Sequence, residues 1–146
     1  MKHLVMLCWA MAAMTMAIGC APKQPPIAPL SANLAVKQVC IEKNQAVEIA
    51  DFLPVVEDGF ARHGIATRVY FGERPKNCPY TVKYVAYRGW DLALYMRLAY
   101  VTMFKDDKKV AGLGYILDGP FSKFGSVQSK IAPRMDEMLA EYPRYR

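Results

Sequence analysis

After residue 33, hydrophobic positions follow first a strand pattern and then a helical one. Residues 34–41 are rich in apolar and β-branched side chains, which predicts a strand. Apolar residues at helical spacing follow, namely Ile49, Phe52, Leu53, Val56 and Phe60. Pro54 fits a first helical turn, so we expect the well-formed helix to begin near Asp51. Gly64, directly after the basic pair Arg62-His63, predicts the C-terminus of this helix.

The middle of the chain has strand patterns. Residues 66–71 predict a short strand, and a loop follows. Residues 80–88 alternate, so that one face of a strand carries Tyr80, Val82, Tyr84 and Ala86. We expect Gly89-Trp90-Asp91 to interrupt this strand.

Two further strands are expected at residues 94–104 and 110–117, because both segments are long and apolar. The charged segment 105–109 between them predicts a hairpin loop. Gly112 and Gly114 lie inside the last strand, where they indicate a bulge or the close approach of another backbone.

A second helix is expected near the C-terminus. Ser126 can cap its first turn, and apolar residues follow at helical spacing: Val127, Ile131, Met135, Met138 and Leu139. We expect it to run to about Tyr142, with a kink or a new start at Pro133. The order β-α-β-β-β-β-α therefore predicts an α+β two-layer sandwich, with a mostly antiparallel sheet and both helices on one face. The other sheet face is then solvated or a binding surface.

Residues 1–19 have the organisation of an export signal. A short polar start precedes an uncharged run over residues 4–18, which is shorter than the ~20 residues of a membrane-spanning helix. The run ends in Ala17-Ile18-Gly19-Cys20, which resembles the bacterial lipobox. We therefore predict cleavage before Cys20 and a lipid (diacylglycerol and palmitate) on the new N-terminal residue. The alternative is an ordinary signal peptide or an uncleaved anchor, with Cys20 incidental.

The residues after Cys20 bear on where such a protein would be attached. Ala21 stands where an Asp would retain a lipoprotein in the inner membrane. By resemblance to Gram-negative lipoproteins, we expect the outer membrane, with the protein facing the periplasm. Residues 20–33 are rich in proline and predict an extended linker that reaches up to ~40 Å and holds the domain off the bilayer. Residues 34–146 then form a single domain.

The chain carries a net charge of +6 at pH 7, which suits a partner with anionic groups. Phospholipid head groups, lipopolysaccharide and an acidic protein are such partners. The basic residues form no lysine and arginine stripe, so nucleic acid is not expected as a partner.

Cysteine positions predict a disulfide. Cys8 lies in the signal, and the thiol of Cys20 would be alkylated, which leaves Cys40 and Cys78. In the oxidising periplasm such a pair usually bridges, and the bond would stabilise the fold by about 4 kcal/mol in the chain-entropy account. Two separate buried thiols are the alternative. A metal site is poorly supported, because His63 would be the single histidine left and no Cys-x-x-Cys spacing occurs.

The motifs together resemble the Sbal-type family of small proteobacterial lipoproteins. The resemblance rests on the lipobox, on His63-Gly64, on Cys78-Pro79-Tyr80 and on Trp90-Asp91, in this order. It covers about residues 34–142. The resemblance implies the domain boundaries and the localisation at the membrane, and it implies no catalytic residue.

The remaining candidate residues have structural interpretations. His63 is explained as a cation at a helix end. Trp90 next to Asp91 is expected to fill the core at a strand break while the carboxylate fixes the turn, although a ligand site there is the alternative. Asp106 and Asp107 are expected in a solvated loop. Ser122, Ser126 and Ser129 lack the Gly-x-Ser-x-Gly context of a hydrolase. The numerous tyrosines leave open which sheet face is wet.

Three classes of function remain. The first, which we expect, is a non-enzymatic, membrane-tethered interaction or accessory module with a protein partner in the envelope. The second is a binder of anionic glycolipid or cell-wall material. The third is an enzyme, which is not expected, because no nucleophile or acid–base set can be assembled from the sequence. No cofactor and no metal are predicted.

Overall fold

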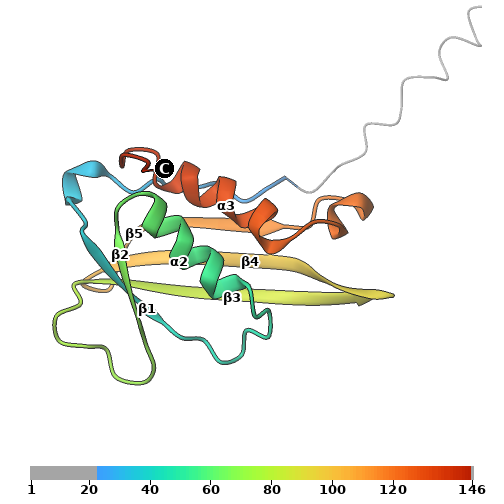
Figure 1. Cartoon of the computed structure of the whole chain (residues 1–146), viewed down its shortest axis with the longest axis horizontal. Helices are drawn as coiled ribbons and strands as arrows, with labels where there is room; N and C mark the ends of the chain where they lie inside the picture. Colours follow the sequence, from blue (N-terminus) through green and yellow to red (C-terminus); the bar gives the residue numbers. More distant parts are fainter. Residues whose placement is uncertain (1–22, 146) are drawn as a thin grey trace, which may run out of the picture.

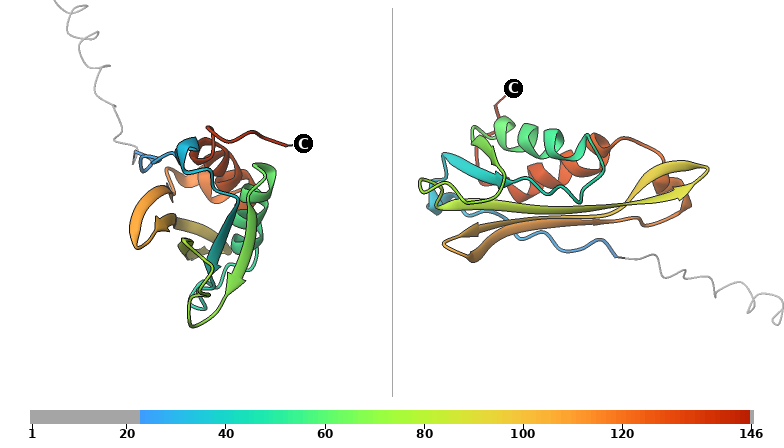
Figure 2. Two further views of the ribbon diagram at one scale, coloured as in Figure 1. Left: turned by 90° about the vertical axis from the view of Figure 1, so that its left-hand side faces the viewer. Right: turned by 90° about the horizontal axis from the view of Figure 1, so that it is seen from below.

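The structure is a computed structural model that describes residues 23–145. Its main elements follow the predicted order: β1 (Gln38–Glu42), α2 (Phe52–Arg62), β2 (Ala66–Tyr70), β3 (Tyr80–Asp91), β4 (Ala93–Lys105), β5 (Lys108–Ile116) and α3 (Val127–Met138). Two short 3-10 helices accompany them, η2 (Ala32–Leu34) and η3 (Pro120–Lys123). Both long helices lie on one side of the sheet (Figure 1; Figure 2, right). The predicted α+β two-layer sandwich is confirmed.

The five strands form one mixed sheet in the order β2-β1-β3-β4-β5. The strands β3, β4 and β5 pair antiparallel, as expected for consecutive strands. β1 differs, because it pairs in parallel with both β2 and β3. The helix α2 connects β1 to β2 as a crossover, and a crossover brings the second strand back in the same direction as the first.

The core lies between the helices and one face of the sheet. α2 contributes the fully buried Phe52, Val56 and Phe60, and α3 contributes Ile131, Met135 and Met138. The two helices meet at Gly59, where a Cβ atom would lie only 2.8 Å from the Met135 side chain. The glycine therefore permits a helix–helix approach that a larger residue would prevent.

The helix ends agree with their sequence signals in most respects. Gly64 has a left-handed φ of 69° after α2, and the side chain of Ser126 accepts a hydrogen bond from the Ser129 backbone amide at the start of α3. α3 ends at Met138 and not near Tyr142, and Pro133 lies within it without starting a new helix. Short backbone turns replace the expected last helical turn, including one from Tyr142 to the Leu139 carbonyl.

The proline-rich segment before residue 34 is packed on the domain along β5, which differs from the expected free linker. Ala28 exchanges two backbone hydrogen bonds with Gly112, of 2.8 and 2.9 Å. The Gln24 side-chain amide donates to the Ile116 carbonyl (2.6 Å) and accepts from the Ile116 amide (3.2 Å), as a backbone peptide would. Leu30 is fully buried. The folded unit therefore includes residues 24–33, which satisfy the backbone groups of Gly112 and Ile116 on an otherwise open sheet edge.

This packing accounts for the two glycines in β5. Gly112 is the residue that Ala28 pairs with, and a Cβ atom on Gly114 would lie 2.7 Å from Pro25 and 2.6 Å from the Tyr100 ring. The prediction that another backbone approaches closely here is confirmed. That backbone is the N-terminal segment itself.

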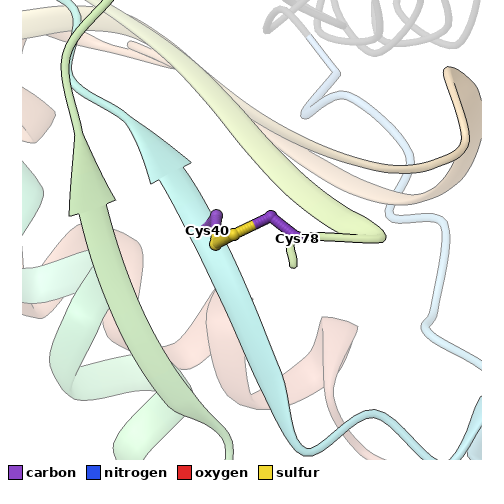
Figure 3. The surroundings of a disulfide bond; sticks show 2 residues. All are labelled: Cys40 and Cys78. Carbon is purple, nitrogen blue, oxygen red and sulfur yellow. A yellow bond between two sulfur atoms is a disulfide. The ribbon is translucent and has the colours of Figure 1, made fainter. Parts of the chain in front are cut away.

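Cys40 and Cys78 are joined by a disulfide, as predicted, with their Cα atoms 5.9 Å apart (Figure 3). The bond connects the middle of β1 to the loop that precedes β3. It closes a loop with a sequence separation of 38 residues, which includes α2 and β2.

Candidate interaction surfaces

Trp90 does not fill the core, and the expectation that it does is wrong. β3 continues through Gly89, Trp90 and Asp91 to a tight turn, and Trp90 pairs with Leu94 across the hairpin. The indole is 71% exposed. The glycine-containing triplet is therefore not a strand break but the last part of a long hairpin, which projects past the helical layer (Figure 1).

Asp91 does not stabilise the turn through the backbone but pairs with Lys123 of η3. The hydrogen bond from Lys123 to Asp91 is the main cause that raises the pKa of the lysine above its ordinary value. The same ammonium group lies 5.4 Å from the centre of the Tyr95 ring. These contacts hold η3 against the hairpin, so Asp91 has a positioning role between two chain segments.

Exposed apolar side chains gather at this end of the molecule. They come from the hairpin and from the segment around η3: Trp90, Leu92, Leu94, Phe121 and Phe124. We refer to these five residues as the tip patch. A shallow hollow of about 330 Å³ lies among them, lined by the hairpin and by Pro120, Lys123 and Phe124. Single exposed apolar residues are ordinary on a protein surface, but a cluster of this kind indicates contact with a partner or a membrane.

The sheet face opposite the helices carries a second hollow, of about 470 Å³. Its floor comes from outward-facing residues of β3 and β4, namely Lys83, Val85, Tyr100, Thr102 and Phe104. Its rim comes from the end of β1 and the segment after it, Glu42 to Ala46, and from Phe71 after β2. We refer to this region as the open-face hollow.

The tyrosines are divided between the two faces of the sheet. The alternating pattern of the sequence does not show which of these faces is exposed to solvent, and the structure does. Tyr84 and Tyr115 lie on the covered face and are buried. Tyr87 and Tyr100 lie on the open face and are exposed. Near the hollow, Lys83 pairs with Glu42 at 3.3 Å. The open-face hollow therefore combines aromatic surface with charged groups of both signs.

His63 is a structural residue at the end of α2, where it is buried. Its Nε2 lies 3.2 Å from the Asp136 carboxylate, and its Nδ1 lies 3.1 Å from the Tyr142 carbonyl oxygen. Arg62 donates a hydrogen bond of 2.9 Å to the same carboxylate. Burial by itself raises the pKa of Asp136, but the hydrogen bonds from Arg62 and His63, together with the positive charges of Arg62 and Arg144, outweigh it and hold the pKa below its ordinary value. The cluster connects α2 to α3.

The other candidate residues have local roles. Ser126 caps α3, Ser129 donates to the Ser126 carbonyl, and Ser122 donates to Asp118. Asp106 and Asp107 form the turn of the β4–β5 hairpin, both with positive φ. Within residues 23–145, no cluster of three or more His, Cys, Asp or Glu side chains could hold a metal ion.

Two points concern the membrane. No helix among the described residues is both long and apolar enough to cross a bilayer. The predicted signal peptide and the predicted lipidation site, Cys20, lie outside the described residues.

Solved structures with a similar fold are those of PelC. A PelC dodecamer from Paraburkholderia phytofirmans matches with a TM-score of 0.52 and 13% identity, over 82% of this chain and 96% of that chain. A single-substitution variant of the same dodecamer matches with a TM-score of 0.53 and 13% identity, over 80% of this chain and 94% of that chain. At this identity the likeness shows the fold alone. No family model and no curated protein matches the sequence.

Proposed function

We propose that this chain is an envelope lipoprotein whose domain is a non-enzymatic interaction module. It is exported, cleaved before Cys20 and tethered by lipid to the outer membrane, where it faces the periplasm. The lipobox at residues 17–20 and the uncharged run before it support the tether. The Cys40–Cys78 disulfide supports export, because such bonds persist in oxidising compartments.

The observation that carries the interaction role is the uncovered sheet face. The helices cover the core face of the sheet, whereas the other face presents the open-face hollow with Phe71 and Tyr100 exposed. Aromatic side chains are costly to leave in water and are enriched where protein partners dock. An envelope protein that places its own side chains in this hollow is the partner that the surface fits best.

Site-specific photo-crosslinking in intact cells tests this proposal. A photoreactive amino acid replaces Tyr100 in the hollow, and a matched control replaces Glu137, which is exposed on α3 on the opposite side of the sheet. We expect one defined protein adduct from position 100 and none from position 137. No protein adduct at position 100, or the same adducts at both positions, would overturn the proposal.

A second candidate is a binder of anionic glycolipid or cell-wall material. It is favoured by Lys43 and Lys83, which line the hollow beside the Tyr100 ring. Ammonium groups pair with phosphates or carboxylates, and aromatic rings pack on sugar rings. This candidate predicts saturable binding of lipid A or peptidoglycan fragments by the mature protein. Binding should be lost in Lys83→Glu and retained in Lys37→Glu, because Lys37 is exposed before β1 and does not line the hollow. Crosslinking that recovers a second copy of the chain would instead favour self-assembly, as in the PelC dodecamers.

A further inference from the structure

The tip patch contains a residue whose conformation is costly for folding. Leu92 forms the apex of the β3–β4 turn with a left-handed φ of 59°, and its side chain is 91% exposed. Glycine, asparagine or aspartate adopts this backbone conformation more easily than leucine. A leucine here has no buried contact to compensate, so the requirements of folding do not account for it. We therefore look for the reason for this leucine in a function of its apolar side chain.

The N-terminal segment leaves the domain toward the same end of the molecule. It runs antiparallel along β5, with Ala28 at Gly112 and Gln24 at Ile116. Gln24 also donates to Asp118, which lies two residues before η3. In Figure 1 the earliest coloured residues and η3 both lie toward the end at which the hairpin projects. The four residues from Gln24 back to Cys20 span at most about 14 Å.

Two ion pairs lie close to the tip patch. Lys123 pairs with Asp91, and Arg88 pairs with Glu48 near the base of the hairpin. The five side chains of the tip patch itself are all apolar and exposed. A partner that it fits presents hydrocarbon together with polar groups that the tryptophan N–H can contact, and the interfacial zone of a bilayer has this composition.

We propose that the tip patch inserts into the interfacial zone of the phospholipid bilayer to which Cys20 tethers the chain. The inference rests on the proposed function for the tether, because the bilayer is within reach of the tip only if the lipid is on Cys20. The patch adds a second point of contact to the lipid anchor. Two contacts fix the orientation of the domain, with the long β3–β4 hairpin rising from the membrane and the open-face hollow held in the periplasm.

The intrinsic fluorescence of Trp90 can report this insertion directly. The chain contains two tryptophans, Trp9 and Trp90, and cleavage before Cys20 removes the first. The mature lipoprotein is reconstituted into vesicles of phosphatidylethanolamine and phosphatidylglycerol, either plain or brominated along the acyl chains. We expect brominated lipid to quench most of the Trp90 emission and iodide in the water to quench little of it. Because the five side chains of the tip patch carry no charge, high salt should change neither result.

Two variants make the test specific. Leu92→Asp places a charge at the apex in a conformation that aspartate tolerates, so the fold should be retained and the quenching by brominated lipid should fall several-fold. Phe71→Asp is the matched control, because Phe71 is also exposed but lies at the open-face hollow. In Phe71→Asp, brominated lipid should quench the Trp90 emission as strongly as in the wild type. Wild-type quenching in Leu92→Asp would overturn the proposal.

The remaining outcomes separate this inference from the tether. If mass spectrometry finds lipid on Cys20 but Trp90 stays open to iodide, the tip inference is wrong and the tether stands. If Trp90 is protected from iodide but not quenched by brominated lipid, a second copy or another protein covers the patch, which also overturns the inference. If Cys20 carries no lipid, the proposed tether fails, and the tip inference, which rests on it, fails as well.

Discussion

Replacing Leu30 by alanine tests whether the proline-rich segment is part of the folded domain. Leu30 is fully buried in the main hydrophobic core, although it lies in the segment 20–33 that the sequence predicts as a linker. Its backbone amide also donates a 2.8 Å hydrogen bond to the Met138 carbonyl oxygen at the end of α3. The side chain therefore contributes to the core next to the last turn of α3.

The expected effect is large. Truncation of a fully buried leucine costs about 2–5 kcal/mol, from lost transfer free energy and from the cavity that remains. A domain of this size has a total stability of roughly 5–15 kcal/mol, so the variant loses a substantial part of it. At about 2–6 °C per kcal/mol, Leu30→Ala should melt roughly 10 °C below the wild type.

Thermal unfolding of the oxidised mature chain, followed by circular dichroism, measures this change. Pro29→Ala is the matched control, because Pro29 precedes Leu30 and is exposed. It should melt within about 2 °C of the wild type. If Leu30→Ala also melts within about 2 °C of the wild type, the segment is a free linker and the reasoning from its burial is refuted.

Three further predictions follow from other contacts. Replacing Cys40 and Cys78 together by serine should lower the free energy of unfolding by about 4 kcal/mol, measured by urea denaturation, and reduction of the wild type should have a similar effect. Because the pKa of Asp136 is held below its ordinary value, its carboxylate stabilises the fold above about pH 4, and this contribution is lost as the pH falls through the lowered pKa. Asp136→Asn should therefore lower the melting temperature at pH 7 and weaken its fall in acid, which melting curves between about pH 2 and 7 would measure. Trp90→Ala should melt within about 2 °C of the wild type, since the indole is exposed; a large loss of stability would contradict the assignment of Trp90 to the surface.

The sequence predicts the elements of this fold well, because each has a local signal. The alternation over residues 80–88 identifies the covered face of β3, where Val82, Tyr84 and Ala86 are buried. Gly64 and Ser126 mark helix ends by their own backbone and side-chain chemistry. The disulfide follows from the number of cysteines and the expected compartment.

Features that depend on contacts between residues distant in sequence are harder to predict from the sequence. Proline content over residues 20–33 predicts an extended linker, but an extended segment can also pair with a strand, as Ala28 does with Gly112 on β5. Glycine and aspartate suggested a break at residues 89–91, but Gly89 serves to accommodate the Tyr95 ring, which lies 2.5 Å from the position of a Cβ atom. The sequence alone does not reveal the tip patch for the same reason, since Phe124 lines one hollow with Leu92 and Leu94 only in three dimensions. A run of large apolar residues beside a turn was the available signal.

The lipid on Cys20 is the point on which the tether, the periplasmic address and the orientation of the domain all depend. Mass spectrometry of the protein purified from membranes measures it directly. The account predicts a mature N-terminus at Cys20 that carries a diacylglycerol thioether and an amide-linked acyl chain, and it predicts that Cys20→Ser abolishes this lipid. A mature N-terminus elsewhere, or a Cys20 without lipid, would contradict the account.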